Sequence, residues 1–379
     1  MLRERIDSMG LKTLSGRNYG LDILKCLSML GVVILHCLSA GGILENVSPL
    51  STNFNVAWLL EIICLHSVNI FAIITGYVSI KSKRVWIRLA DLWFSVIFYS
   101  ILLGGAFFLL GNAGLSEFIF TSFPVINGTH WYFCAYIVIW LFMPYINKLI
   151  QSLSKKQHLT LILISLVLFS GINFIGEIFD KSPFVLKDGY SPTWLLTLYF
   201  IGSYLRLYAE SFNKIKKIPC LLTFFGCSLL SWIVNFVLTF IGGDIAARLT
   251  ATLRTYPSPL MVLGAISMVL FFSKLDVKHY KKLIVTLSAS SFFVYIIHTN
   301  PFFWSLVIDR LKFTVSEPWY VLVFAVFALA IIIYTVCMVT DIIRQKLFKL
   351  FHINKLYEFV VKILFSCFNR LREFLLNKI

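Results

Sequence analysis

The chain alternates between long apolar runs and short polar or basic breaks. A helix needs about 20 apolar residues to cross a bilayer, and ten runs approach that length. They fall at residues 20–42, 56–80, 89–111, 129–150, 159–176, 192–209, 219–241, 257–273, 283–307 and 319–341. The pattern predicts an all-α polytopic membrane protein, built as a bundle of about ten transmembrane helices.

Composition and charge support this prediction and suggest an orientation. Hydrophobic residues make up 59% of the 379 residues, against roughly 45–50% in soluble domains. Of the 34 Lys and Arg residues, 27 fall in one alternate set of breaks, six in the other, and Lys25 lies inside the first run. Because cytoplasmic loops carry the excess of Lys and Arg, we expect both termini in the cytoplasm. The same distribution explains the net charge of +16 without a nucleic-acid partner.

The two ends of the chain differ from the apolar middle. Residues 1–19 are polar and basic and are expected to form a cytoplasmic N-terminal segment. The first apolar run has no convincing cleavage site, so we expect it to remain as the first membrane helix of a core spanning 20–341. In 342–379, apolar residues recur at helical spacing among Lys and Arg. This favours a basic amphipathic helix on anionic membrane lipid; a final packed helix of the bundle is the alternative.

The first apolar run carries three ionisable residues, Asp22, Lys25 and His36. Such groups cost roughly 2.5–3.5 kcal/mol each at the bilayer centre, so they are rare there and usually functional. Eleven residues of helix rotate by about 1100°, which returns His36 to the face of Lys25 about 16 Å further along the axis. Asp22 lies within about 40° of the same face. The spacing predicts one polar stripe and makes these three residues candidate catalytic groups.

Polar residues in two further runs are candidate substrate-binding groups. The second run holds His66 and Asn69, although a buried Asn more often serves as a hydrogen bond between helices. Glu61 lies near the outer end of that run and is either a solvated boundary residue or part of the site. The fourth run opens with His130 and Trp131 at the outer interface, where aromatic residues are common in any membrane protein.

The ninth run adds Ser291, Tyr295 and His298, which share a helical face. Packing through a hydroxyl network is the alternative to a role in binding. Pro301 is expected to kink this helix near its outer end. The eight cysteines form no Cys-x-x-Cys pair and no metal-ligand spacing, so we interpret them as packing residues. We expect no metal and no permanently bound cofactor.

These motifs together resemble those of the acyltransferase 3 family of integral membrane acyltransferases. That family has a base, ten residues and then His in its first helix, and here Lys25 and His36 hold those positions. The base is most often Arg in the family; Lys keeps the charge without the bidentate fork. Three weaker motifs follow in the family order, at residues 69–77, 130–133 with 143–144, and 291–298.

The resemblance implies a membrane O-acetyltransferase, with acetyl-CoA as cytoplasmic donor and a surface polysaccharide or lipid-linked glycan, such as O-antigen, as acceptor. It also implies the inner membrane of a bacterium. His is the natural general base for an acceptor hydroxyl, so we expect His36 to act as base or as transient acyl carrier. Lys25 would contact the donor, and Asp22 would hold Lys25.

Two other functions fit the same topology. A polysaccharide transporter or polymerase would also have many apolar helices, basic inner loops and polar residues along a passage. A purely structural membrane partner is the third reading, and the aligned polar face of the first helix argues against it. Transfer of label from acetyl-CoA would separate the enzyme from the transporter.

Overall fold

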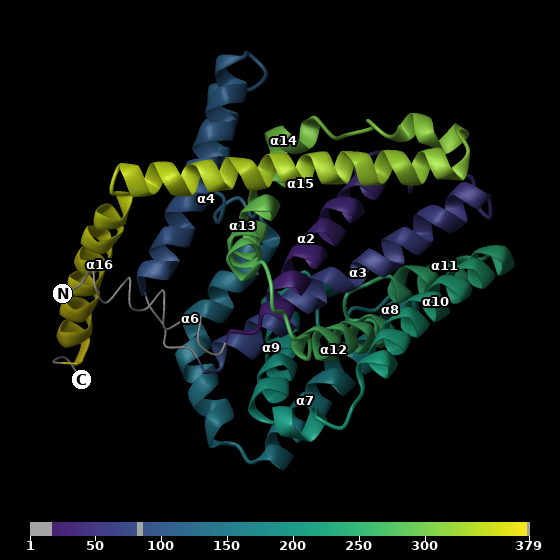
Figure 1. The fold of residues 1–379 in the computed structure, drawn as a ribbon, viewed down its shortest axis with the longest axis horizontal. Helices are drawn as coiled ribbons and strands as arrows, with labels where there is room; N and C mark the ends of the chain where they lie inside the picture. Colours follow the sequence, from purple (N-terminus) through teal and green to yellow (C-terminus); the bar gives the residue numbers. More distant parts are fainter. Residues whose placement is uncertain (1–16, 82–85, 377–379) are drawn as a thin grey trace.

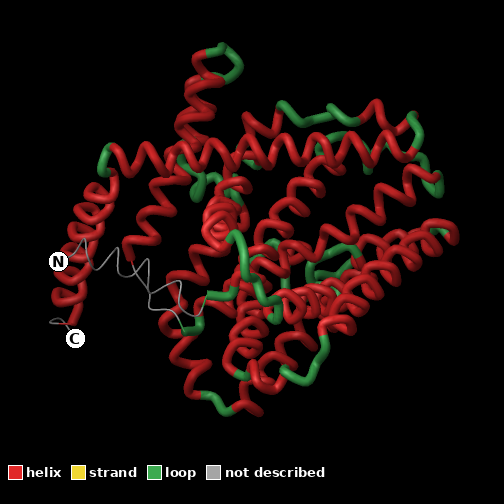
Figure 2. The backbone as a smooth tube through the Cα atoms, viewed as in Figure 1, coloured by secondary structure: helices red, strands yellow, loops and turns green. Residues whose placement is uncertain are grey.

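The computed structural model describes residues 17–81 and 86–376. Most of the predicted N-terminal segment, residues 1–16, lies outside the described residues. Within the described part all regular structure is helical and no strand is present, and short loops join the helices (Figure 2). Seven helices in these two described ranges are long and apolar enough to cross a membrane. The prediction of an all-α polytopic membrane protein is confirmed.

A helix occupies each of the ten predicted spans. These are α2 (Tyr19–Ser39), α3 (Thr52–Ser79), α4 (Trp86–Leu109), α6 (Trp131–Ser152), the continuous α7 (Lys155–Leu166), η1 (Val167–Ile172) and α8 (Asn173–Ile178), then α9 (Pro192–Leu207), α10 (Lys217–Ile241), α12 (Pro259–Ser273), α13 (Lys281–His298) and α15 (Trp319–Leu350). Of these, α9, α12 and α13 have only 16, 15 and 18 residues. They fall short of the roughly 20 residues that a span needs, so the count of ten crossings stays a prediction.

Short elements complete the chain. They are α5 (Leu115–Thr121), α11 (Asp244–Leu253), α14 (Pro301–Ser305), the 3-10 turns η2 (Lys187–Gly189), η3 (Ala209–Phe212) and η4 (Lys312–Ser316), and the terminal helix α16 (Ile353–Leu376). Side chains fix where several helices begin. The Asn18 amide oxygen accepts a hydrogen bond from the Leu21 N–H, and the Ser51 hydroxyl accepts one from the Phe54 N–H. Such caps satisfy backbone donors that a helix start leaves unpaired.

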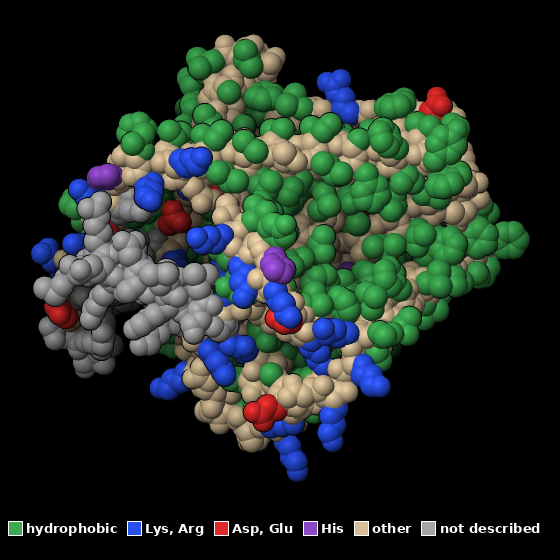
Figure 3. All heavy atoms as spheres, viewed as in Figure 1, with side chains coloured by type: hydrophobic (Ala, Val, Ile, Leu, Met, Phe, Trp, Pro, Cys, Tyr) green, Lys and Arg blue, Asp and Glu red, His purple; other side chains and the backbone are tan. Residues whose placement is uncertain are grey.

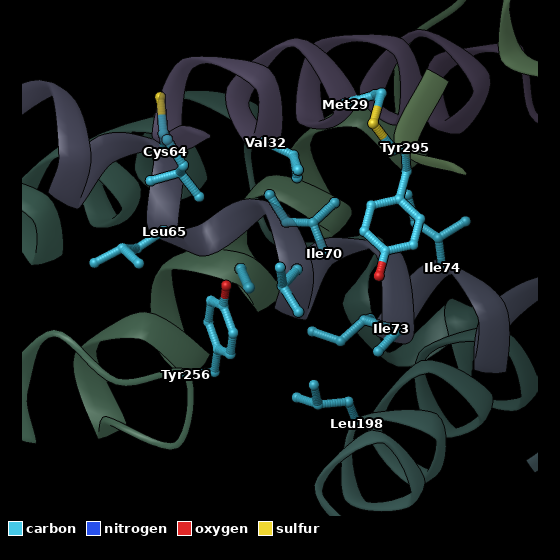
Figure 4. Packing of buried hydrophobic residues seen from close by; sticks show 14 of the residues in the cluster. Met29, Val32, Cys64, Leu65, Ile70, Ile73, Ile74, Leu198, Tyr256 and Tyr295 are labelled. Carbon is cyan, nitrogen blue, oxygen red and sulfur yellow. The ribbon is translucent and has the colours of Figure 1, made fainter. Parts of the chain in front are cut away.

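Helix α3 is the centre of the packing, with α2, α9, α10 and α12 against it (Figure 1). Two glycines allow the closest of these approaches. A Cβ on Gly76 would lie 2.2 Å from the Tyr199 carbonyl oxygen, and a Cβ on Gly202 would lie 1.9 Å from that of Ile73. Figure 4 shows the buried hydrophobic residues that fill the space around α3, including Met29, Val32 and Tyr295.

The predicted ninth span, 283–307, is wrong at its outer end. Helix α13 stops at His298, and a separate short helix, α14, begins at Pro301. The Asn300 side chain accepts a hydrogen bond from the Phe302 N–H at 3.1 Å, and proline has no N–H to continue the helix before it. Pro301 therefore marks a break rather than a kink.

Helix α15 continues past its predicted end at 341. A buried cluster holds this extension, in which the Arg344 Nε lies 2.8 Å from Asp341 Oδ1 and the Tyr99 hydroxyl donates to the same oxygen at 2.8 Å. Helix α16 then turns back towards α4, where the Tyr357 and Phe94 rings stack with centroids 5.0 Å apart. The predicted tail is thus largely a helix that packs on α4; its residues 377–379 lie outside the described part.

The surface separates charge from apolar area. Figure 3 shows Lys and Arg side chains gathered over the lower and left part of the molecule, around α7 and α16, while hydrophobic side chains cover most of the rest of this face. Exposed hydrophobic residues include Leu222 and Phe225 on α10 and Phe324 and Ile331 on α15. An apolar band beside a basic end is the arrangement of a protein embedded in a bilayer.

Candidate active site

The first turns of α2 carry a charged cluster centred on the buried carboxylate of Asp22. Lys25 Nζ lies 3.8 Å from Asp22 Oδ1, so the predicted pairing of these side chains is present. Two further groups that the sequence did not indicate share the carboxylate: Arg17 Nε lies 2.6 Å from Oδ2, and the Ser288 hydroxyl donates to Oδ1 at 2.8 Å. Asp22 therefore holds two cations side by side and ties α2 to α13.

At the other end of α2, His36 is paired with His298 of α13. His36 Nδ1 lies 2.8 Å from His298 Nε2, and His298 Nδ1 lies 2.6 Å from the Val294 carbonyl oxygen. A carbonyl only accepts, so Nδ1 of a neutral His298 carries the proton and its Nε2 is an acceptor. His36 must then donate from Nδ1. The chain of bonds leaves His36 Nε2 unprotonated, with a lone pair available.

His36 lines a cavity of about 430 Å³. The Trp304 ring of α14 stands edge-on to the imidazole with centroids 4.6 Å apart. The remaining lining residues come from α2, α3, the start of α6, α13, α14 and the separate loops of Tyr190 and Tyr256: Met29, Val32, Leu35, Val68, Phe71, Thr129, Trp131, Tyr132, Tyr190, Tyr256, Phe292, Tyr295, Thr299 and Pro301. An apolar hollow with few convergent polar groups is typical of a small-molecule site.

Aromatic rings dominate this lining. Trp131 lies against Tyr190, with ring centroids 4.5 Å apart, and stacks on Tyr256 at 6.2 Å. The Tyr295 hydroxyl accepts a hydrogen bond from the Tyr132 N–H at 3.2 Å, which leaves its own proton free to donate. Such rings offer a flat apolar face together with a polar edge. The predicted residues Trp131, Tyr295 and His36 are therefore brought together in one cavity.

Two predicted substrate-binding residues lie elsewhere. His66 contacts the Met261 carbonyl oxygen at 3.0 Å and the Ser228 hydroxyl at 3.1 Å, so it joins α3 to α12 and α10. Asn69 donates to the Tyr256 carbonyl oxygen at 2.8 Å and accepts from Trp194 Nε1 at 3.0 Å. Neither lines the cavity. Both side chains therefore serve contacts between segments of the bundle. The Asn69 bond also helps to position Tyr256, which does line the cavity.

His130 is buried at the start of α6, between two residues that line the cavity. Its Nδ1 lies 3.0 Å from the Thr299 hydroxyl, which donates its proton to the Tyr295 carbonyl oxygen. The hydroxyl therefore accepts from His130. This contact ties α6 to the break after α13, so His130 supports the cavity without lining it.

Sequence reasoning missed Tyr190, Tyr256 and Trp304 as lining residues. Tyr190 and Tyr256 lie in loops more than 60 residues apart and have no periodic pattern. For Trp304 the signal was present, because Pro301 marks the break that turns the chain back over His36.

The site lies within a segment that a family model recognises. The model described as an acyltransferase domain, that of acyltransferase 3, matches residues 18–337. The chain belongs to the acyltransferase 3 family. The match runs from the start of α2 well into α15 and includes every residue of the cavity. No curated protein and no solved structure matches the chain.

Membership of the acyltransferase 3 family makes this protein a membrane acyltransferase and confirms the resemblance in the sequence. The base and His of the first helix form the two ends of the α2 stripe, and the motif at 291–298 ends on the partner of His36.

Proposed function

We propose that this acyltransferase 3 protein moves an acetyl group from acetyl-CoA to a hydroxyl of a surface or lipid-linked polysaccharide, such as O-antigen, in the inner membrane of a bacterium. The observation that carries the proposal is the hydrogen-bonded pair of His36 and His298, with a free lone pair on His36 in an aromatic cavity. Acyl transfer to a hydroxyl requires a base in that position.

The transfer is written with its protons balanced. His36 Nε2 takes the proton of the acceptor hydroxyl as the oxygen attacks the thioester carbonyl. The tetrahedral intermediate then expels the CoA thiolate, which receives that proton from Nε2. Tyr295 is the group we assign to the oxyanion, because its hydroxyl proton is free to donate. The same lone pair would serve a two-step route in which His36 carries the acetyl group.

The donor is proposed to reach His36 along α2. The Arg17 and Lys25 cations at the cytoplasmic end suit the phosphates of acetyl-CoA. Met29 and Val32, which lie between Lys25 and His36 on the helix, line the cavity and would contact the pantetheine arm. The orientation rests on the distribution of Lys and Arg.

The test uses radiolabelled acetyl-CoA and membranes that contain both the protein and its native glycans. Base-labile label in the glycan fraction is the expected product. His36→Ala should lower incorporation about 10²–10⁴-fold, the range for loss of a general base. His279→Ala is the matched control, because His279 is exposed and outside the cavity.

The same measurement distinguishes the acetyltransferase from the alternative function. A polysaccharide transporter or polymerase would bind glycan without consuming acetyl-CoA. Full incorporation by a correctly inserted His36→Ala protein would remove His36 from the mechanism.

A further inference from the structure

A second cavity, of about 590 Å³, lies next to the cavity of His36. The two share Tyr190 and Tyr256, whose hydroxyl oxygens lie 3.5 Å apart. The walls of the second cavity come from the first half of α3, the end of α8 with the loop that follows it, and α11 with the residues that follow it. By the distribution of Lys and Arg, these segments lie at the outer side of the membrane.

Unlike the cavity of His36, the second cavity is lined by charged side chains. Four carboxyl groups line it, those of Glu61, Glu177, Asp180 and Asp188, together with two guanidinium groups, those of Arg248 and Arg254. Oε2 of Glu61 is buried and has no hydrogen-bond partner among the described residues. A buried acceptor oxygen without a partner calls for an explanation, and a ligand donor is one.

The Arg254 side chain is held by contacts with other residues of the protein. Its guanidinium carbon lies 3.8 Å from the centroid of the Trp58 ring, and its Nε donates to the Thr250 carbonyl oxygen at 3.0 Å. Burial lowers the pKa of Arg254 to about 10, with Glu61 acting in the opposite direction, so the group is charged at neutral pH. Burial, and secondly the charge of Glu177, raises the pKa of Asp188.

We propose that the second cavity is the acceptor subsite, that it takes a neutral, hydroxyl-rich glycan segment, and that one hydroxyl reaches His36 past Tyr190 and Tyr256, the residues that the two cavities share. This inference rests on the proposed function. Carboxylates accept hydrogen bonds and cannot donate them, so they match sugar hydroxyls. The four carboxyl groups outnumber the guanidinium groups of Arg248 and Arg254, so the lining disfavours a uronic acid or a phosphorylated sugar. Tyr190 and Tyr256 supply the aromatic faces on which a sugar ring packs.

The charge of the cavity can be measured at one pair of alanines on α11. Ala251 lines the cavity, and Ala247, one turn earlier and also exposed, does not. Ala251→Cys and Ala247→Cys proteins are treated with cationic and anionic methanethiosulfonates, and peptide mass spectrometry gives the rate at each site. Combining Glu61→Gln with Asp188→Asn should lower the ratio of cationic to anionic rate several-fold at 251 and leave it unchanged at 247. An unchanged ratio at 251 would overturn the assignment of an acidic subsite.

Use of the cavity by the acceptor is tested in the labelled acetyl-CoA assay with native glycans. Attachment of a benzyl group to Cys at 251 should block incorporation, while the same modification at 247 should not. Methyl glucoside should also compete more strongly than methyl glucuronoside. Full incorporation after modification at 251, or competition that is equal or stronger for the glucuronoside, would overturn the inference. Failure of the unmodified wild-type protein to incorporate label would instead count against the proposed function.

Discussion

A hydrogen bond that the His36 imidazole itself makes decides which of its ring nitrogens carries the proton. The Val294 carbonyl fixes the proton of His298, and His298 fixes that of His36, so the lone pair is directed away from the pair. His298 was expected to bind substrate. The structure pairs it with His36 outside the cavity lining, so in the proposed mechanism it would act as a positioning residue.

The His298 contact gives the first prediction. His298→Ala should lower kcat by roughly 10–100-fold, the range for groups that orient a functional imidazole through its second nitrogen, with little change in the KM for acetyl-CoA. His298→Gln should recover part of kcat, because its amide can donate to Val294 and accept from His36. Steady-state kinetics with labelled acetyl-CoA measure both constants. Equal loss in the two variants, with protein correctly folded, would show that His298 does not act through this bond.

The second prediction concerns the charged cluster at the start of α2. Lys25→Ala should raise the KM for acetyl-CoA, whereas Lys25→Arg should retain most activity, because Arg keeps the charge and adds a fork suited to phosphate. Lys156→Ala on the exposed start of α7 is the control for simple loss of charge. The idea of a donor contact fails if Lys25→Ala binds acetyl-CoA as well as wild type.

At the scale of elements, α3 contributes Val68 and Phe71 to the cavity and packs closely against α9. Gly76 and Gly202 place the backbone of each helix against the other, so no side chain separates them. This contact sets α3 in place between α2 and α9. The break between α13 and α14 has a comparable effect, since it allows Trp304 to stand against His36.

Substitution at the helix contact should therefore destabilise the fold. Gly202→Val should lower stability by about 1–3 kcal/mol or more, the range for overpacking, because the new Cβ would overlap the Ile73 carbonyl oxygen. Gly226→Ala on α10 is the control, since a Cβ there meets no atom within 4 Å. Thermal denaturation in detergent compares the two. If Gly202→Val unfolds at the same temperature as the wild-type protein, α3 and α9 can move apart without loss of stability.

At the scale of the whole molecule, the terminal helix stands apart from the site. The family segment ends at 337, and α16 packs on α4 through contacts such as Tyr357 with Phe94. The buried Asp341 and Arg344 pair belongs to α15 and binds it to α4, so residues up to Leu350 are part of the bundle.

Truncation after Leu350 should consequently lower yield and melting temperature more than turnover per folded molecule. Each basic residue beside an anionic leaflet contributes about 1 kcal/mol of attraction. The truncated protein would lose the attraction that the Lys and Arg residues of α16 contribute. Specific activity normalised to folded protein is the measurement. Truncation after 340, which also removes Asp341 and Arg344, should in addition prevent folding. Complete loss of specific activity in folded protein truncated after Leu350 would place the tail in the active site.

The sequence by itself determined the membrane class, the positions of the ten apolar helices and the polar stripe from Asp22 to His36. These follow from local patterns: apolar runs of bilayer length, and the rotation of one helix. It also contained the motif order that identifies the family. Caps such as Asn18 and breaks such as Pro301 are local too, and they fix where helices begin and end.

Only the tertiary structure decided which groups meet. His36 and His298 are 262 residues apart, and Tyr190 reaches Tyr256 from another loop. No spacing along the chain encodes such contacts, because they depend on how helices pack. For the same reason the sequence could not show that His66 and Asn69 lie outside the cavity lining. Both are on α3 with residues that do line it, but His66 bonds to α12 and α10 and Asn69 bonds to Trp194.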